Sequence, residues 1–193
     1  MKYYVTALGM AFAITLPHAA LPQTITPPAV PPGLEVTDGS QPFLVGHGVG
    51  TQNYVCAPTD KLGHVDWTLF TPEATLFSDD NLQLTTHFSS PNPGEGGVVV
   101  RVSWQDSRDT SAVWGRAVAQ ATVDPSAIDW LKIQRAGSRV GPTGGNTLAV
   151  ATFLQRVNTE GGLAPSEGCD ATPDVGKKAF IPYAADYIFY KKN

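Results

Sequence analysis

The stretch VVVRVSWQ, residues 98–105, has the two-residue period of a β-strand. Its even-numbered residues are all apolar, whereas arginine, serine and glutamine interrupt the odd-numbered face. The same alternation recurs in His64–Phe70 and in Leu82–Phe88. In the second of these, the face that carries His87 is polar and the opposite face is apolar. The pattern therefore predicts three strands in this part of the chain.

Other runs rich in β-branched or aromatic residues extend this pattern to both sides. They are Thr51–Cys56, Ala112–Gln120, Ile128–Arg135, Leu148–Asn158 and Tyr183–Tyr190. Proline and glycine clusters separate nearly all of the runs. Short strands at this spacing predict an all-β single domain, either a β-sandwich or a barrel, of about 8–10 mostly antiparallel strands with little helix.

The first twenty residues have the layout of a secretory signal peptide. Lys2 precedes the apolar run VTALGMAFAITL, residues 5–16, and PHAA, residues 17–20, ends the run with small residues. The run is too short to cross a bilayer as a helix, which needs about 20 apolar residues. We predict a signal peptide at 1–20, a Pro-rich linker at 21–33 and the domain at 34–193. The expected location is secreted, extracellular or periplasmic, with no membrane span after the signal is removed.

Cys56 and Cys169 are the chain's two cysteines. In an oxidising compartment, two cysteines in one domain usually form a disulfide. No C-x-x-C motif suggests redox chemistry, and the four histidines show no ligand spacing that would complete a zinc site. The expectation is therefore a structural Cys56–Cys169 disulfide and no metal.

The formal net charge of −4 argues against nucleic acid as a partner, since the basic residues form no cluster longer than a Lys-Lys pair. The segment GHGVG, residues 46–50, has the wrong spacing for a dinucleotide fingerprint, and the strand-like QNYVC follows it where a helix would be needed. No G-x-S-x-G or H-E-x-x-H motif occurs. We therefore predict no cofactor.

His87 and Asp106 are the catalytic candidates. A histidine whose pKa lies near neutrality can act as a general base, and a nearby carboxylate could orient it. The alternative for His87 is an ordinary solvated or hydrogen-bonded strand residue. Asp106 stands in the turn sequence WQDSRD, where aspartate is a common turn former.

The binding candidates are Trp104, Gln155, Arg156 and Asn158. Gln155 and Arg156 point to opposite faces of one strand, so one of the two either faces inward or lines a groove. An inward arginine needs a partner, and Asp170 or Asp186 could supply a buried salt bridge. On the last strand, Tyr183, Ala185, Tyr187 and Phe189 share a face, which favours a core position over a sugar-binding platform.

Several stretches together resemble DUF3455, a domain of unknown function found in secreted bacterial and fungal proteins. They are GVGTQNYVC, His87-Phe88, Trp104-Gln-Asp-Ser, FLQRVNTEGGLAP and YAADYIFY. The similarity covers about Gly33 to Tyr190. Ser89 to Gly97 lengthen the loop that follows the histidine in the family pattern. The resemblance implies a fold and export but no reaction.

These observations favour an exported binding or surface-associated β module, with cell-wall or extracellular glycans or proteins as candidate partners. The alternative is a cofactor-independent hydrolase or isomerase that uses His87 with a nearby acid. The sequence leaves enzymatic activity undecided and favours its absence.

Overall fold

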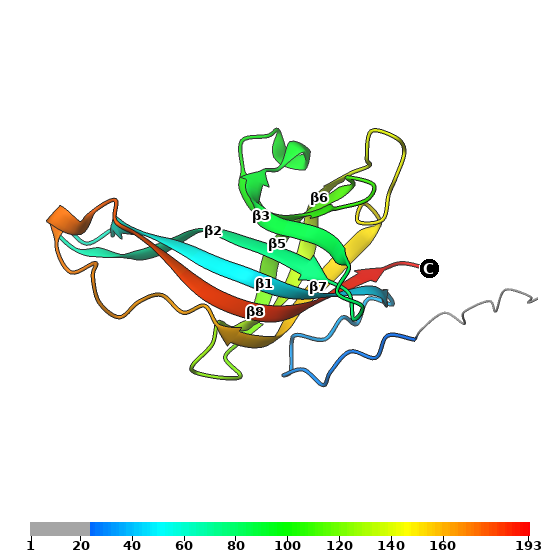
Figure 1. Ribbon diagram of the computed structural model, residues 1–193, viewed down its shortest axis with the longest axis horizontal. Helices are drawn as coiled ribbons and strands as arrows, with labels where there is room; N and C mark the ends of the chain where they lie inside the picture. The colour runs from blue at the N-terminus through cyan, green and yellow to red at the C-terminus, as the bar shows by residue number, and fades with distance from the viewer. Residues whose placement is uncertain (1–23) are drawn as a thin grey trace, which may run out of the picture.

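Eight antiparallel strands close into a barrel in the computed structural model, which describes residues 24–193 (Figure 1). Each strand pairs with the next along the chain, and β8 pairs with β1. The strands are β1 Gln41–Pro58, β2 Val65–Phe77, β3 Gln83–Pro91, β4 Val100–Asp106, β5 Ala112–Ala121, β6 Trp130–Arg139, β7 Ala151–Gly161 and β8 Lys178–Lys191. The predicted all-β class and antiparallel pairing are confirmed, and the sheet closes as a barrel. The predicted signal peptide lies outside the described residues.

β1 begins earlier than the sequence pattern predicted, because the glycines of GHGVG lie within the strand. Gly46, Gly48 and Gly50 alternate on the inward face, where there is no room for a side chain. A Cβ on Gly48 would lie 3.0 Å from the Tyr187 ring, and a Cβ on Gly50 would lie 2.0 Å from the Glu73 carbonyl oxygen. Glycine therefore lets β1 approach its neighbours closely.

Two prolines lie inside strands, although proline usually breaks a strand. Pro72 is opposite Gln52 of β1, and the pairing of β2 with β3 begins only at Ala74. Pro182 is opposite Thr51, just before the pairing of β8 with β7 begins at Tyr183. Each proline stands where one of the two ladders is only beginning, a position in which strands tolerate proline, and the Pro182 carbonyl still accepts from the Gly162 N–H at 3.0 Å.

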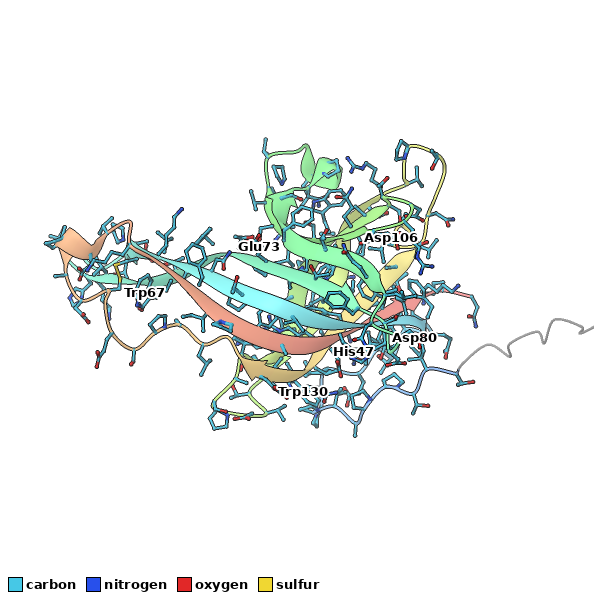
Figure 2. All side chains as sticks on the ribbon, in the orientation of Figure 1. His47, Trp67, Glu73, Asp80, Asp106 and Trp130 are labelled. Carbon is cyan, nitrogen blue, oxygen red and sulfur yellow. A yellow bond between two sulfur atoms is a disulfide. The ribbon has the colours of Figure 1, made fainter. Side chains whose placement is uncertain are left out.

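β1, β2 and β8 continue beyond the other strands as a three-stranded arm (Figure 1). The disulfide Cys56–Cys169 joins β1 in this arm to the loop between β7 and β8, with the two Cα atoms 5.4 Å apart. The predicted disulfide is confirmed. Trp67, which lies on the arm in Figure 2, donates from Nε1 to the Glu167 carbonyl of the same loop at 3.0 Å. Both contacts hold the long loop against the arm.

The inner faces of the strands form the main core, which includes Leu76, Trp104, Leu154, Tyr187 and Phe189. The face of β8 that carries Tyr183, Ala185, Tyr187 and Phe189 is therefore a core face, as the sequence predicted. A second cluster lies outside the barrel and is centred on Val157, Ile188 and Tyr190. Ile25 and Val30, from the described part of the Pro-rich segment, pack against this outer cluster.

Little helix is present among residues 24–193. It consists of the one-turn 3-10 helices Pro93–Glu95, in the lengthened β3–β4 loop, and Thr172–Asp174, in the β7–β8 loop. None of the helices within 24–193 has the length and apolar character that a membrane-crossing helix needs.

Candidate functional site: the barrel mouth

A cavity of about 580 Å³ opens at the end of the barrel from which the arm projects. Every strand from β1 to β7 contributes at least one lining residue, and we call this cavity the barrel mouth. Its apolar wall includes Leu131, Ile133 and Val102. Cavities of this size and character are typical of small-molecule sites.

The charged residues of the barrel mouth are mainly basic. Arg101, Arg116 and Arg156 line it together with one acid, Asp129. Arg101 is paired with Glu95 at 2.7 Å, and Arg116 donates to the Gln134 amide oxygen at 3.1 Å. Because Glu95 offsets the charge of Arg101, the two other arginines exceed Asp129 by one positive charge at the mouth.

Arg156 lies on the inward face of β7, the face that also carries the fully buried Leu154. Its Nε and one terminal nitrogen donate to the Asp129 backbone carbonyl at 3.1 and 2.8 Å. No carboxylate among residues 24–193 forms a salt bridge with it. The backbone carbonyl orients the guanidinium without neutralising its charge.

The salt bridge expected for Arg156 is therefore wrong. Asp186 accepts hydrogen bonds from Asn158 and His47 on the outer surface, and Asp170 accepts from the Gly168 amide in the β7–β8 loop. Both acids lie away from the inward face of β7 because alternation places β8 residue 186 outside the barrel, and residue 170 is beyond the strand end.

His87 points inward and is only 3% exposed, so it is not a solvated residue. Its imidazole stacks on Trp104 and its Nδ1 lies 2.9 Å from the Ser103 carbonyl, which makes Nδ1 the protonated nitrogen. Burial lowers the pKa of His87 to about 3, and the Ser103 carbonyl opposes this shift only in part. The ring is consequently neutral at physiological pH.

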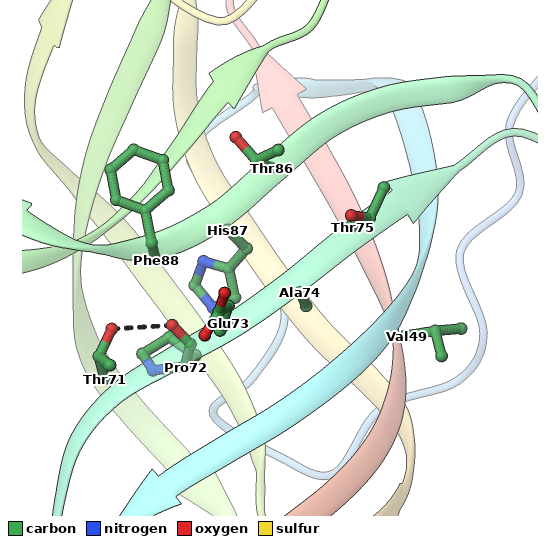
Figure 3. Close-up of a pocket in the computed structure, with 9 residues that line it drawn as sticks. All are labelled: Val49, Thr71, Pro72, Glu73, Ala74, Thr75, Thr86, His87 and Phe88. Carbon is green, nitrogen blue, oxygen red and sulfur yellow. Dashed lines mark hydrogen bonds between the residues drawn. The ribbon is translucent and has the colours of Figure 1, made fainter. Parts of the chain in front are cut away.

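A second hollow lies on the outer surface where β2 separates from β3 (Figure 3). This outer groove of about 460 Å³ is lined by polar residues such as Thr71, Glu73 and Thr86. Pro72 and His87 line both the groove and the barrel mouth. The wall between the two spaces is thin at this point, because the β2–β3 ladder ends at the pair Ala74 and His87.

Asp106 lies diagonally across the β3–β4 ladder from His87, but no hydrogen bond joins the two side chains in the described part of the chain. Its Oδ1 accepts the backbone N–H groups of Arg108 and Asp109, each at 2.8 Å, in the β4–β5 turn. That turn is at the end of the barrel opposite the mouth, and Figure 2 shows Asp106 far from the arm residue Trp67. Asp106 thus acts as a turn former, the alternative that its sequence context offered.

The other predicted site residues are dispersed. Trp104 is completely buried in the core. Gln155 faces outward beneath the N-terminal segment, where Nε2 donates to the Leu34 carbonyl at 2.6 Å and Oε1 accepts from the Tyr190 hydroxyl. Asn158 lies on the exposed surface. Of the six predicted residues, only His87 and Arg156 line the barrel mouth.

Gln52 is a residue of the mouth that the sequence reading missed. It is 1% exposed, and its Nε2 has no hydrogen-bond partner in the structure. Its alternation with Tyr54 and Cys56 would have placed it on an inward face. Gln52 lies within the predicted run Thr51–Cys56, but its residue type alone does not show that its amide faces a cavity.

The fold and this site together define a small up-and-down β-barrel with one disulfide and a cavity at an open end. A family model described as "Protein of unknown function (DUF3455)" matches residues 37–191, and the chain belongs to this family. No curated protein and no solved structure shows a significant match.

Proposed function

We propose that this protein is an exported binding module that takes a small ligand into the barrel mouth. The observation that carries the proposal is Arg156, a guanidinium that lines the cavity and has no carboxylate partner among the described residues. An uncompensated charge at a partly buried position is costly unless something binds to it. Eight-stranded barrels are also wide enough to hold one small ligand.

Export is supported by two independent features. The disulfide belongs to an oxidising compartment, and the first twenty residues have the pattern of a signal peptide. A binding module that works outside the cytoplasm fits both features.

The alternative hydrolase or isomerase has less support. His87 forms no hydrogen bond with an acid or a hydroxyl among residues 24–193, because its Nδ1 bonds to the Ser103 carbonyl. With a pKa of about 3, its imidazole is also a weak base. No described group of three or more His, Cys, Asp or Glu side chains could hold a metal ion that would supply another route to hydrolysis.

The proposal is tested with the neutral fluorescent probe N-phenyl-1-naphthylamine and the mature chain. We expect the probe to brighten on entering the barrel mouth. Ala117→Trp, which fills the mouth from β5, should abolish the increase, whereas Val118→Trp on the neighbouring exposed position should preserve it. Equal probe binding by both variants, or no binding by the native protein, would overturn the proposal.

A further inference from the structure

Three features of the barrel mouth identify the chemistry of its ligand: an unpaired cation, an unpaired buried donor and an apolar rim. The inference drawn from them rests on the proposed function, because it specifies what the mouth binds. Each feature comes from different residues.

The cation is Arg156. Its contacts with the Asp129 carbonyl use Nε and one terminal nitrogen, and the guanidinium also acts on the Tyr187 hydroxyl, so its remaining N–H donors face a neutral partner and no anion. A guanidinium edge matches the two oxygens of a carboxylate in one plane. The ligand group that meets Arg156 should therefore be a planar anion.

The unpaired donor is the amide of Gln52. Its side chain is almost fully buried, and Nε2 makes no hydrogen bond of normal length and angle, although the Tyr183 hydroxyl lies close enough for the amide to act on the pKa of that phenol. A buried donor without a good acceptor destabilises the protein, so a ligand that supplies an acceptor oxygen is favoured at this position. Burial raises the pKa of the Tyr183 phenol, and both Gln52 and Arg156 act in the opposite direction. Gln52 and Arg156 line the same cavity, and both act on the Tyr183 hydroxyl.

The rim is apolar and exposed. Leu69, Val100 and Leu163 line the barrel mouth and are 45%, 58% and 43% exposed. Further inside, Ile128 and Leu131 continue the apolar wall. Apolar side chains that remain in water around a cavity mark a surface that another apolar group covers.

We propose that the barrel mouth binds a carboxylate with an apolar body, holding the carboxylate with Arg156 and Gln52 and the body against Leu69, Leu131 and Leu163. Glu95 neutralises Arg101, whereas Arg116 has the uncharged Gln134 amide as its partner and adds a positive charge that attracts the anion. A single free guanidinium suits one negative charge better than a phosphate dianion.

The test measures the binding of decanoate by calorimetry, below its micelle concentration, with 1-decanol, decylamine and decylphosphonate as matched ligands. We expect decanoate to bind at least tenfold more tightly than 1-decanol and decylphosphonate, and decylamine not to bind. Arg156→Gln should weaken decanoate binding about 10–100-fold, which is the loss of a hydrogen bond to a charged group. Gln52→Leu should weaken it about fivefold or more.

Two controls keep this test separate from that of the proposed function. Arg108→Gln, an exposed arginine on the β4–β5 turn, should leave decanoate affinity unchanged. Arg156→Lys should bind decanoate with an affinity between those of the native protein and Arg156→Gln. It replaces Arg156→Gln in the comparison if that variant fails to fold. If N-phenyl-1-naphthylamine occupies the mouth but decanoate and 1-decanol bind alike, the carboxylate assignment is wrong and the binding module stands. Tighter binding of decylphosphonate would equally overturn the carboxylate assignment.

Discussion

The imidazole of His87 stacks on the indole of Trp104, with ring centroids 4.2 Å apart and planes within 7° of parallel. The two residues are paired across β3 and β4, so the ladder itself sets the stack. Tyr187 closes the other approach to the imidazole, at 5.2 Å between centroids. A histidine enclosed in this way stays neutral, and its neutrality can be measured.

The first prediction concerns acid stability. Because the pKa of His87 is about 3 in the folded protein and 6.5 ordinarily, the unfolded chain binds the extra proton between these values. Stability should therefore fall as the pH is lowered from 6.5 towards 3, by up to about 1.4 kcal/mol per pH unit from this group. Urea unfolding between pH 7 and pH 4 should show that the free energy of unfolding falls less steeply with decreasing pH in His87→Gln than in the native protein. An identical slope in both proteins, with exposed His64→Gln as control, would contradict a buried neutral His87.

The second prediction concerns His47, whose protonation has the opposite effect. His47 lies between Asp186 at 2.7 Å and Asp79 at 2.9 Å, and these carboxylates raise its pKa. The stabilisation from the protonated His47 is fully present below the ordinary pKa of 6.5, and it is lost as the pH rises through the raised pKa of the folded protein. Native protein should exceed His47→Gln in Tm at pH 5.5 and converge with it at pH 9. Because the cluster is partly exposed, high salt should reduce the difference. A difference in Tm between the two proteins that grows as the pH rises would contradict a raised pKa for His47.

Much of the fold was accessible from the sequence because alternation is a local property. Each of the expected runs overlaps a single strand, and Cys56 could be paired with Cys169 because the chain has no other cysteine. The extent of β1 was not accessible, since glycines at 46, 48 and 50 give no alternation signal and their role depends on neighbouring strands. The choice between barrel and sandwich also depends on the β1–β8 pairing, which joins distant parts of the chain.

The candidate site was accessible only in part. His87 and Arg156 were singled out by their residue type within a strand, and both line the mouth. Asp106 was chosen because it follows Trp104 in sequence, but its carboxylate accepts backbone N–H groups of the β4–β5 turn and makes no bond to His87. Gln52 went unnoticed because an unpaired amide is defined by what surrounds it in three dimensions.

The third prediction concerns the glycines of β1. Gly50→Ala should destabilise the protein by about 1–3 kcal/mol or more, because the new Cβ would meet the Glu73 carbonyl and the Ala74 Cα at 2.0 and 2.5 Å. The free energy of unfolding in urea measures the loss. Val49→Ala, at the exposed neighbour, should change stability by less than about 0.5 kcal/mol. Equal effects from the two substitutions would argue against the close approach of β1 to β2.

The fourth prediction concerns the disulfide. The bond closes a separation of 113 residues, so replacing both cysteines by alanine should cost about 4–5 kcal/mol on the chain-entropy account. Urea unfolding of the oxidised native protein and the double variant measures this cost. Peptide mapping of the native protein should recover Cys56 linked to Cys169, and two free thiols would contradict the structure.

The central claim is that a ligand enters the barrel mouth, and an NMR titration with decanoate locates the binding site directly. With ¹⁵N-labelled protein, the account predicts shifts of the Arg156 Nε–H and Gln52 side-chain amide signals. The indole N–H of Trp67, on the far part of the arm, and the amide of Asp106 should stay unchanged. Shifts confined to the arm or to the opposite end of the barrel, with Arg156 and Gln52 unmoved at saturation, would contradict it.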